Sequence, residues 1–402
     1  MSTRTTLRGA EPEVAYDAWL GALAEAGWQA PLCTEIVPLD EAAGRVLGTP
    51  LIALAANPPH RCAAMDGYAV VAAEAGRGVV PPGSYLRIDT GQPLEGRYDA
   101  VAQLEIAGES AAGLLVERPV EPGTNVRAAG EDVREGDALL PAGRLLSSYD
   151  IALAAVAGHA ELAVALRPRV AILPTGGELR PPGSVLLPGE VADADGPMLQ
   201  ALARALGAAC ERLPARPDDA EAIGAALAAA VAESDLVLVI AGSSRGRADH
   251  TAAVLERHGE LVAHGVALRP AHPVALGVVE GTPVIGIPGY PVAAAMAFER
   301  FARPLLELLL GALPEDAPLI RVRLIGEVRA KRGIEAYVPL VLSAGDDLPN
   351  ALPQSRKGGA LRGLAGAHAL LRARLEDGVL PAGSEVDARL LRPWPRPAGT
   401  NP

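Results

Sequence analysis

The hydrophobic and polar positions divide the chain into segments with different periods. Between residues 169 and 312, short apolar runs such as VAILP and LVLVI alternate with stretches such as PMLQALARALG, whose apolar residues recur every three to four positions. The runs are typical of strands buried on both faces, and the stretches are typical of amphipathic helices. Strands that alternate with helices pair in parallel, so this segment predicts a three-layer α/β domain.

The segments on either side of this domain have other patterns. Apolar residues at helical spacing in 12–46 predict a helical segment, with an end near Gly27 and Pro31. Residues 143–166 return to a helical pattern, so 1–46 and 143–168 form a predicted helical linker domain. Short β-rich pieces between turns at 47–142 predict a small β domain inserted between the two helical parts. The β pattern of 316–393 predicts a C-terminal β domain, followed by a tail at 394–402. The predicted fold class is therefore α/β plus β.

Composition excludes several classes of protein. The chain has 36 Lys and Arg against 48 Asp and Glu, and only 3% aromatic residues, which argues against nucleic-acid binding. Its three cysteines, Cys33, Cys62 and Cys210, are too few and too widely spaced for a disulfide framework or a cysteine-based zinc site. No uncharged apolar run approaches about 18 residues, and the N-terminus lacks the apolar core of a secretory signal. We therefore expect a cytoplasmic, soluble, multidomain protein that binds neither nucleic acid nor membrane.

Three turns of the predicted α/β domain are candidates for ligand binding. Each follows a predicted strand, is rich in glycine or proline, and leads into a helix. Ligands of open α/β sheets bind outside the carboxyl ends of the strands, where glycine permits close backbone approach and helix starts favour anions. The turns suggest a phosphate-bearing ligand, although glycine is common at such turns in any α/β protein. Their candidate ligand-binding residues are Thr175, Gly176, Gly242, Ser243, Ser244, Gly246, Pro288 and Gly289.

Four carboxylates are candidates for metal binding or catalysis. Glu178 and Asp249 follow two of the turns, and carboxylates near phosphates commonly hold a divalent cation. The alternative is that they stabilise the helix dipole. Asp66 in AMDGYAV and Asp132 in GED could instead be turn-forming residues.

Two further residues could bind an oxyanion. They are Arg269 and His272, which lie in the segment Arg-Pro-Ala-His-Pro. The alternative is a solvated loop without a ligand.

Six segments, in this order along the chain, resemble the MoeA/gephyrin E-domain family, the molybdopterin molybdenumtransferases. The segments are AMDGYAV at 64–70, DTGQPLEG at 89–96, NVRAAGEDV at 125–133, LPTGGEL at 173–179, GSSRGRAD at 242–249 and IPGYPVA at 287–293. The resemblance covers nearly the whole chain. It implies that the 169–312 domain binds molybdopterin and that the protein is an elongated homodimer whose active site is shared between subunits.

The resemblance also implies a reaction and a set of roles. Members take adenylated molybdopterin and molybdate, or the related tungstate, cleave the phosphoanhydride with Mg²⁺ and release AMP. Asp66, Asp132, Glu178 and Asp249 match catalytic positions, of which Asp66, Glu178 and Asp249 would hold the metal. Thr90 matches a hydroxyl position of the same site.

Several positions depart from the family pattern. A Lys-Pro-Gly-Lys-Pro loop is replaced by the segment with Arg269 and His272, and histidine is mostly neutral near pH 7. Most departures fall on positions that favour an oxyanion in the family, so a non-catalytic carrier of molybdenum cofactor stays open beside the insertase. An unrelated sugar- or nucleotide-binding α/β protein is a third reading. The other departures are Gly177, Asp195 after Asp193, Tyr290, Ala293, Pro339 and Gly363.

Overall fold

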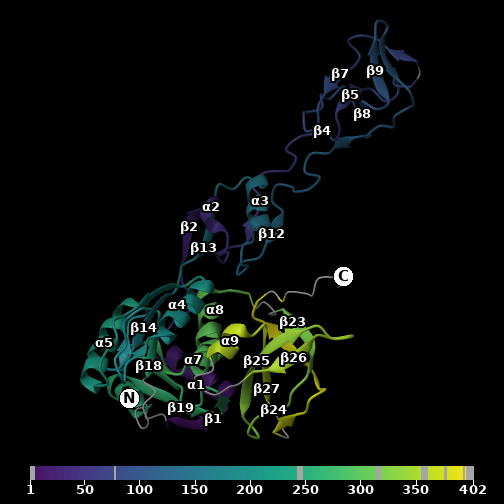
Figure 1. Cartoon of the computed structure of the whole chain (residues 1–402). Coiled ribbons are helices and arrows are strands. Elements are labelled where there is room, and N and C mark those ends of the chain that lie inside the picture. Colours follow the sequence, from purple (N-terminus) through teal and green to yellow (C-terminus); the bar gives the residue numbers. More distant parts are fainter. Residues whose placement is uncertain are drawn as a thin grey trace. The chain divides into compact units, whose positions relative to one another are not determined.

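The computed structural model describes residues 5–76, 78–241, 248–313, 318–354, 361–374, 378–392 and 394. The chain divides into two compact units (Figure 1). One unit spans Thr34–Ala165, and the other combines the chain before and after it. The second unit contains the α/β domain and the C-terminal β domain.

The α/β domain is built on a seven-stranded mixed sheet. Six strands run in the same direction, and β21 alone is antiparallel to its neighbours β19 and β22. In spatial order the strands are β1 (Leu7–Ala10), β19 (Glu260–Val266), β21 (Ala275–Val279), β22 (Thr282–Pro288), β18 (Leu236–Ala241), β14 (Arg169–Pro174) and β17 (Ala209–Arg212).

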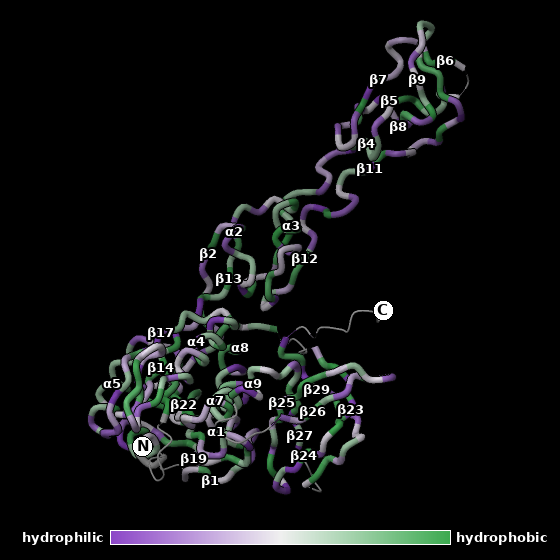
Figure 2. Tube along the Cα trace, in the orientation of Figure 1, coloured by the Kyte–Doolittle hydropathy of each residue, from purple (hydrophilic) through white to green (hydrophobic). Residues whose placement is uncertain are grey.

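Helices cover both faces of this sheet. Successive side chains of a strand point to opposite faces, so each strand contributes to two cores. On β14, Val170 and Ile172 join one core, whereas Ala171 and Leu173 join the other. The hydropathy of the chain follows this layering, with apolar stretches along the central strands (Figure 2). The first core is covered by α1 (Pro12–Glu25), α4 (Asp195–Ala205), α7 (Pro291–Ala297), the π-helix η1 (Phe298–Ala302) and α8 (Arg303–Leu310), and the second by α5 (Ala220–Glu233) and α6 (Ala248–His258).

The C-terminal domain is a closed β-barrel of five strands. Closure follows from β25, which pairs with β26 through its second half and with β27 through its first half. Strand β20 (Leu268–Arg269) of the α/β domain also pairs with the barrel, in parallel with β25. The ring consists of β23 (Leu319–Leu324), β26 (Asn350–Pro353), β25 (Glu335–Ser343), β27 (Ala369–Arg374) and β29 (Glu385–Leu390). A separate two-stranded antiparallel sheet of β24 (Val328–Arg329) and β28 (Val379–Leu380) and the helix α9 (Leu361–Gly366) belong to the same domain.

The unit Thr34–Ala165 has a mixed part, made of short strands and two short helices rather than the predicted helices alone, and a β part. The mixed part packs Leu47, Leu51, Leu140 and Leu146 into one core. Its elements are β2 (Thr34–Pro38), α2 (Leu39–Ala42), β3 (Leu51–Ile52), β12 (Ala138–Leu140), α3 (Ser148–Val156) and β13 (Glu161–Ala165). The β part consists of β4 (Cys62–Ala63), β5 (Gly67–Val70), β6 (Val79–Val80), β7 (Leu86–Ile88), β8 (Ala100–Gln103), β9 (Ala107–Ser110), β10 (Gly113–Val116) and β11 (Val126–Arg127).

The structure confirms the predicted α/β plus β fold and differs from the sequence-based reading at the N-terminus. The first helix ends at Glu25, close to the predicted end near Gly27 and Pro31, whereas residues 34–38, which were assigned to the helical segment, form a strand. The first strand and helix belong to the α/β unit rather than to a linker, because β1 extends the large sheet and Trp19 lies in its core. Within the described ranges, no helix is both long and apolar enough to cross a membrane.

Candidate functional site

The turn after β14 is held by a buried threonine. Thr175 is 2% exposed, and both its backbone N–H and its Oγ1 donate to the carbonyl of Ile240 on β18, at 2.9 and 2.8 Å. The hydroxyl proton is therefore committed to joining two strands, and only the oxygen lone pairs remain for a ligand. The predicted binding residue thus fixes the geometry of the turn.

The backbone conformation favours glycine at the next position, where the carboxylate two residues later lies close. Gly176 has a φ of +144°, and a Cβ built on it would lie 3.0 Å from Oε2 of Glu178. The Glu178 carboxylate therefore folds back over the turn, in the space that a side chain at position 176 would take. This arrangement places an oxygen donor at the carboxyl edge of the sheet.

A cavity of about 190 Å³ opens at this edge. Its wall combines the ends of β14 and β18 with the start of α7 and the start of α4. The polar and functional residues that line it are Thr175, Glu178, Asp193, Asp195, Gly289 and Tyr290.

Two buried carboxyl groups of this cavity differ in their partners. Asp193 accepts the backbone N–H of Gly196 at 2.8 Å, and its Oδ2 lies 3.7 Å from the guanidinium of Arg212. Asp195 is 6% exposed, and its Oδ1 has no hydrogen-bond partner. Burial, assisted by the charge of Asp193, raises the pKa of Asp195 to about 7. The cavity therefore holds one carboxyl group that titrates near neutral pH.

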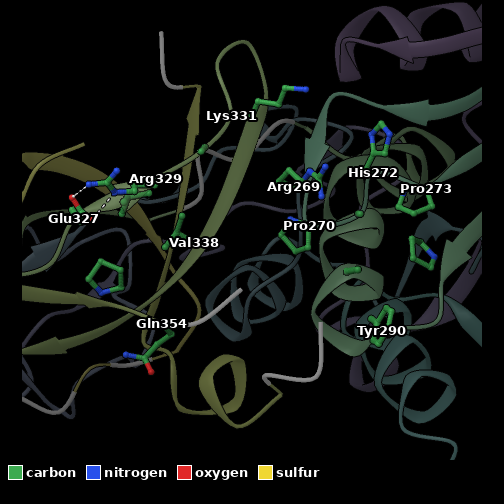
Figure 3. A pocket seen from close by; sticks show the side chains of 16 residues that line it. Arg269, Pro270, His272, Pro273, Tyr290, Glu327, Arg329, Lys331, Val338 and Gln354 are labelled. Carbon is green, nitrogen blue, oxygen red and sulfur yellow. Dashed lines mark hydrogen bonds and ion pairs between the residues drawn. The ribbon is translucent and has the colours of Figure 1, made fainter. Parts of the chain in front are cut away.

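A second, larger cleft of about 1000 Å³ lies between the α/β domain and the barrel (Figure 3). Arg269, His272 and Tyr290 line it from the α/β side, and Arg329 and Lys331 line it from the barrel side. The cleft thus carries positive charge on both walls, which suits an anionic ligand.

The cations of this cleft are not equivalent. Arg329 is paired with Glu327 through contacts of 2.6 and 3.0 Å, so part of its charge is already balanced. His272 donates from Nδ1 to the carbonyl of Val266, which leaves Nε2 as its free ring nitrogen. Sequence reasoning missed Arg329 and Lys331, although the basic run RAKR was visible.

The β part of the other unit presents an exposed carboxylate with two donors. Asp66 accepts the backbone N–H of Thr90 at 2.7 Å and its hydroxyl at 2.8 Å. These bonds, from the backbone first and the side chain second, hold the pKa of Asp66 below its usual value. Asp132 lies in the same unit and accepts from Nδ2 of Asn57 at 3.1 Å.

The structure brings some predicted residues together and leaves others apart. Glu178, Thr175 and Gly289 line the small cavity, with Gly176 in the same turn, whereas Arg269, His272 and Pro288 line the large cleft. Tyr290 lines both. Gly242, Ser243, Ser244 and Gly246 lie outside the described residues, as does the side chain of Asp249 on the first turn of α6.

A metal site is not assembled by the described side chains of this chain alone. None of their groups of three or more His, Cys, Asp and Glu residues is placed to hold a metal ion. Glu178 nevertheless supplies oxygen donors of the kind that Mg²⁺ prefers. A complete site would need further ligands, such as the predicted Asp249 and Asp66.

Two family models match the sequence. Residues 16–158 match the model described as the MoeA N-terminal region (domain I and II). Residues 171–308 match the model described as a probable molybdopterin binding domain. The second match coincides with the α/β domain that carries the small cavity.

Curated proteins with similar sequences share a common name. Molybdopterin molybdenumtransferase 2 of Mycobacterium tuberculosis is 32% identical over 368 residues, which cover 83% of this chain and 89% of that protein. Molybdopterin molybdenumtransferase of Haemophilus influenzae is 33% identical over 300 residues, which cover 70% of this chain and 74% of that protein.

Solved structures agree with the fold over almost the whole chain. Two structures of molybdopterin biosynthesis MoeA protein from Pyrococcus horikoshii match with TM-scores of 0.81 and 0.77, at 29% and 25% identity. They cover 96% and 95% of this chain, and 100% and 99% of their own.

Proposed function

This chain belongs to the MoeA family, and from that premise we propose that it is a molybdopterin molybdenumtransferase, which transfers molybdenum from molybdate to adenylated molybdopterin and releases AMP. Membership confirms the resemblance found in the sequence. The observation that carries the proposed reaction is the adjacency of two sites of different chemistry. Tyr290 borders both a carboxylate-lined cavity at the strand ends and a cation-lined cleft.

The small cavity is the proposed site of the pterin nucleotide. It lies at the carboxyl ends of β14 and β18, where α/β domains bind such ligands. Glu178 lies over the turn and would hold Mg²⁺ together with Asp249 of the same chain and Asp66 of the partner subunit. When bound, Mg²⁺ would neutralise charge that builds on the phosphoanhydride during cleavage.

The large cleft is the proposed site of the incoming oxyanion. Arg269 keeps a full positive charge at any physiological pH, and Lys331 adds a second cation from the opposite wall. These groups would hold molybdate or tungstate beside the pterin, so that the reacting atoms are close without a covalent enzyme intermediate.

AMP release tests this proposal directly. Purified protein with adenylated molybdopterin, molybdate and Mg²⁺ should release AMP, and chelation of the metal should stop it. Glu178→Gln should lose most of this activity, because the neutral amide is a far weaker metal ligand. Glu190→Gln is the matched control, since Glu190 pairs with Arg180 at 2.6 Å and does not line the cavity. No AMP release, while a related transferase works in parallel, would contradict the proposal.

A shared active site is the second part of the proposal. We propose a homodimer in which Asp66 of one subunit completes the site of the other. Asp66→Ala and Glu178→Gln chains should then be inactive separately, whereas mixed dimers should recover roughly a quarter of the activity, since half of the dimers hold one intact site of two. No recovery after subunit exchange, or a monomer in scattering, would oppose a shared site.

A non-catalytic carrier of molybdenum cofactor is the second candidate. Two features of the large cleft favour it: Arg329 is already paired with Glu327, and the half-exposed Tyr290 ring stands between the two sites. Calorimetry separates the candidates, because a carrier binds molybdopterin tightly without releasing AMP from its adenylated form.

A further inference from the structure

The small cavity contains two buried carboxyl groups with too little positive charge around them for both to be ionised. Asp193 and Asp195 are only 9% and 6% exposed. Among the residues that the structure describes, the cation paired with either of them is Arg212 on β17, which lies 3.7 Å from Asp193. Two ionised carboxylates in one buried site repel each other and lose hydration, so the site favours one charge rather than two.

The contacts show which of the two keeps the charge. Asp193 receives the N–H of Gly196 and faces Arg212, both of which stabilise a carboxylate. Asp195 has an Oδ1 that is buried at the cavity wall and meets no donor. The proton of the pair therefore belongs on Asp195.

The other groups around the pair do not change this assignment. Glu178 on the same cavity adds negative charge, and Arg180 is occupied by its 2.6 Å ion pair with Glu190. The packed helix α7 contributes no ionisable side chain. The N-terminus of α4 favours an ionised Asp195, but burial and the charge of Asp193 outweigh this dipole, which leaves the pKa near 7.

We propose that Asp195 contacts the bound ligand as a neutral carboxylic acid, and that its O–H donates a hydrogen bond to the ring carbonyl of the pterin. The inference rests on the proposed function, because it places the pterin in the small cavity. It makes Asp195 a specificity-determining residue, selecting a heterocycle with a carbonyl acceptor over one without.

The proposed hydrogen bond from Asp195 to the ligand depends on the protonation state of Asp195. A protonated carboxyl group donates one hydrogen bond, whereas an ionised carboxylate only accepts. Loss of the proton would therefore set a buried carboxylate against the carbonyl oxygen of the ligand. Binding would weaken as the protonated fraction falls, because the apparent affinity scales with the competent fraction.

The experiment compares the full-length wild-type protein with Asp195→Asn, whose amide donates at every pH. Calorimetry measures binding of molybdopterin, and of AMP as a probe whose base has no carbonyl, between pH 5.5 and 8.5. At pH 8.5 the wild type should bind molybdopterin roughly thirtyfold more weakly, relative to Asp195→Asn, than at pH 5.5. AMP binding should have the same pH profile in both proteins. Asp193→Asn should move the wild-type transition to lower pH, because it removes the neighbouring charge.

Two results would overturn the inference while leaving the proposed function in place. One is a pH profile for molybdopterin that is the same in wild type and Asp195→Asn. The other is loss of molybdopterin binding at all pH values in Asp195→Asn with AMP binding retained, which would mean that the carboxylate itself is needed. Absence of both molybdopterin and AMP binding in the wild type would instead overturn the proposed function, and the inference with it.

Discussion

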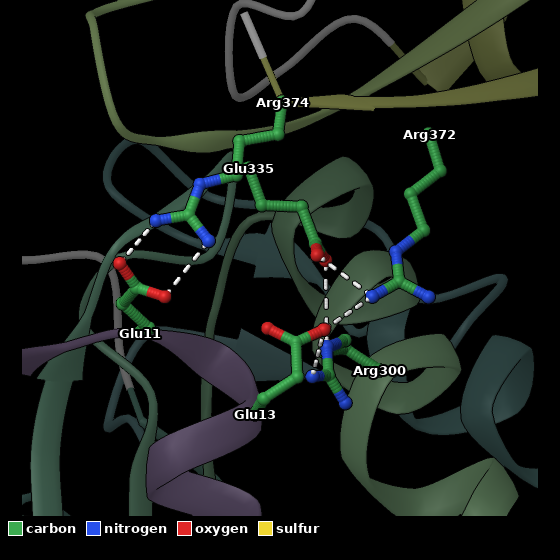
Figure 4. Close-up of polar contacts among 6 residues, drawn as sticks. All are labelled: Glu11, Glu13, Arg300, Glu335, Arg372 and Arg374. Atoms are coloured by element: carbon green, nitrogen blue, oxygen red, sulfur yellow. Dashed lines mark hydrogen bonds and ion pairs between the residues drawn. The ribbon is translucent and has the colours of Figure 1, made fainter. Parts of the chain in front are cut away.

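Removing Arg300 should destabilise the α/β unit more than any exposed arginine, because it breaks a buried ion-pair network (Figure 4). Arg300 lies on η1 and is 8% exposed. It contacts Glu13 on α1 at 2.9 Å and Glu335 on β25 at 3.4 Å, so it joins the α/β domain to the barrel. We choose Arg300→Met, which keeps much of the side-chain volume and removes the charge.

The magnitude follows from what the substitution leaves behind. Glu335 is 6% exposed, and its Oε1 already lacks a hydrogen bond. Without Arg300 it keeps its contact with Arg372, at 2.8 Å. Breaking a buried pair commonly costs 3–5 kcal/mol, and the remaining Arg372 reduces this to about 3 kcal/mol of the free energy of unfolding. The double variant Arg300→Met/Glu335→Gln should lose less free energy of unfolding than the sum of the two single variants, by a coupling energy of about 2 kcal/mol.

The assay is urea unfolding of the full chain with Trp19 as the reporter. The chain has three tryptophans, so phenylalanine at the other two positions leaves the signal of Trp19, which is buried and donates to the carbonyl of Gly277 at 2.7 Å. Arg374→Met is the matched control, since Arg374 pairs with Glu11 in a half-exposed contact and should give no measurable change.

Two outcomes would refute this reasoning. If Arg300→Met and Arg374→Met shifted the unfolding midpoint equally, burial would not decide the strength of these pairs. If the Arg300 and Glu335 substitutions were additive, the two side chains would not be coupled, and this ion pair would not help to hold the barrel on the α/β domain.

Three further predictions concern single groups. Thr90→Val removes one of the two donors to Asp66, so the pKa of Asp66 should rise toward its ordinary value in a carbon-detected NMR titration; an unchanged value would mean that the backbone N–H alone sets it. Gly67→Ala should cost about 3 kcal/mol and melt the β part early in calorimetry, because its Cβ would lie 2.2 Å from the carbonyl oxygen of Ala102; a normal melting temperature would contradict this close approach. The pKa of Asp195 is raised from 3.8 to about 7, so the folded state holds a proton that the unfolded state releases. The free energy of unfolding should therefore fall by about 4 kcal/mol as the pH rises from below 4 to above 7. Urea unfolding at each pH should show this slope in the wild type and not in Asp195→Asn.

The alternation of strands and helices was readable from the sequence, but the direction of every strand was not. The segment PVIGIPG was readable as a strand, but its antiparallel partner ALGVV was not, and the structure makes a hairpin of β21 and β22. Its turn residues Glu280 and Gly281 both have positive φ, which is typical of a two-residue hairpin loop. Strand β1 was not predicted because it is a short edge strand, and its pairing with β19 depends on tertiary packing.

The candidate site was predictable where it follows a strand and not where it depends on a neighbouring domain. Thr175 and Glu178 were found because ligands bind at the carboxyl ends of parallel strands. Arg329 ends β24 and Lys331 follows it in the C-terminal domain, and only the packing of the barrel beside β20 brings them to the cleft of Arg269. No local pattern records such a contact.

The discontinuous second unit has a consequence for synthesis of the chain on the ribosome. The indole N–H of Trp19 donates to the carbonyl of Gly277, which is synthesised 258 residues later, so this contact cannot form before then. At about 5–20 residues per second, that delay is on the order of tens of seconds. The unit Thr34–Ala165 is complete well before then and is free to fold first. Nascent chains halted before β19 should therefore leave α1 open to proteases, and chains halted after β22 should protect it.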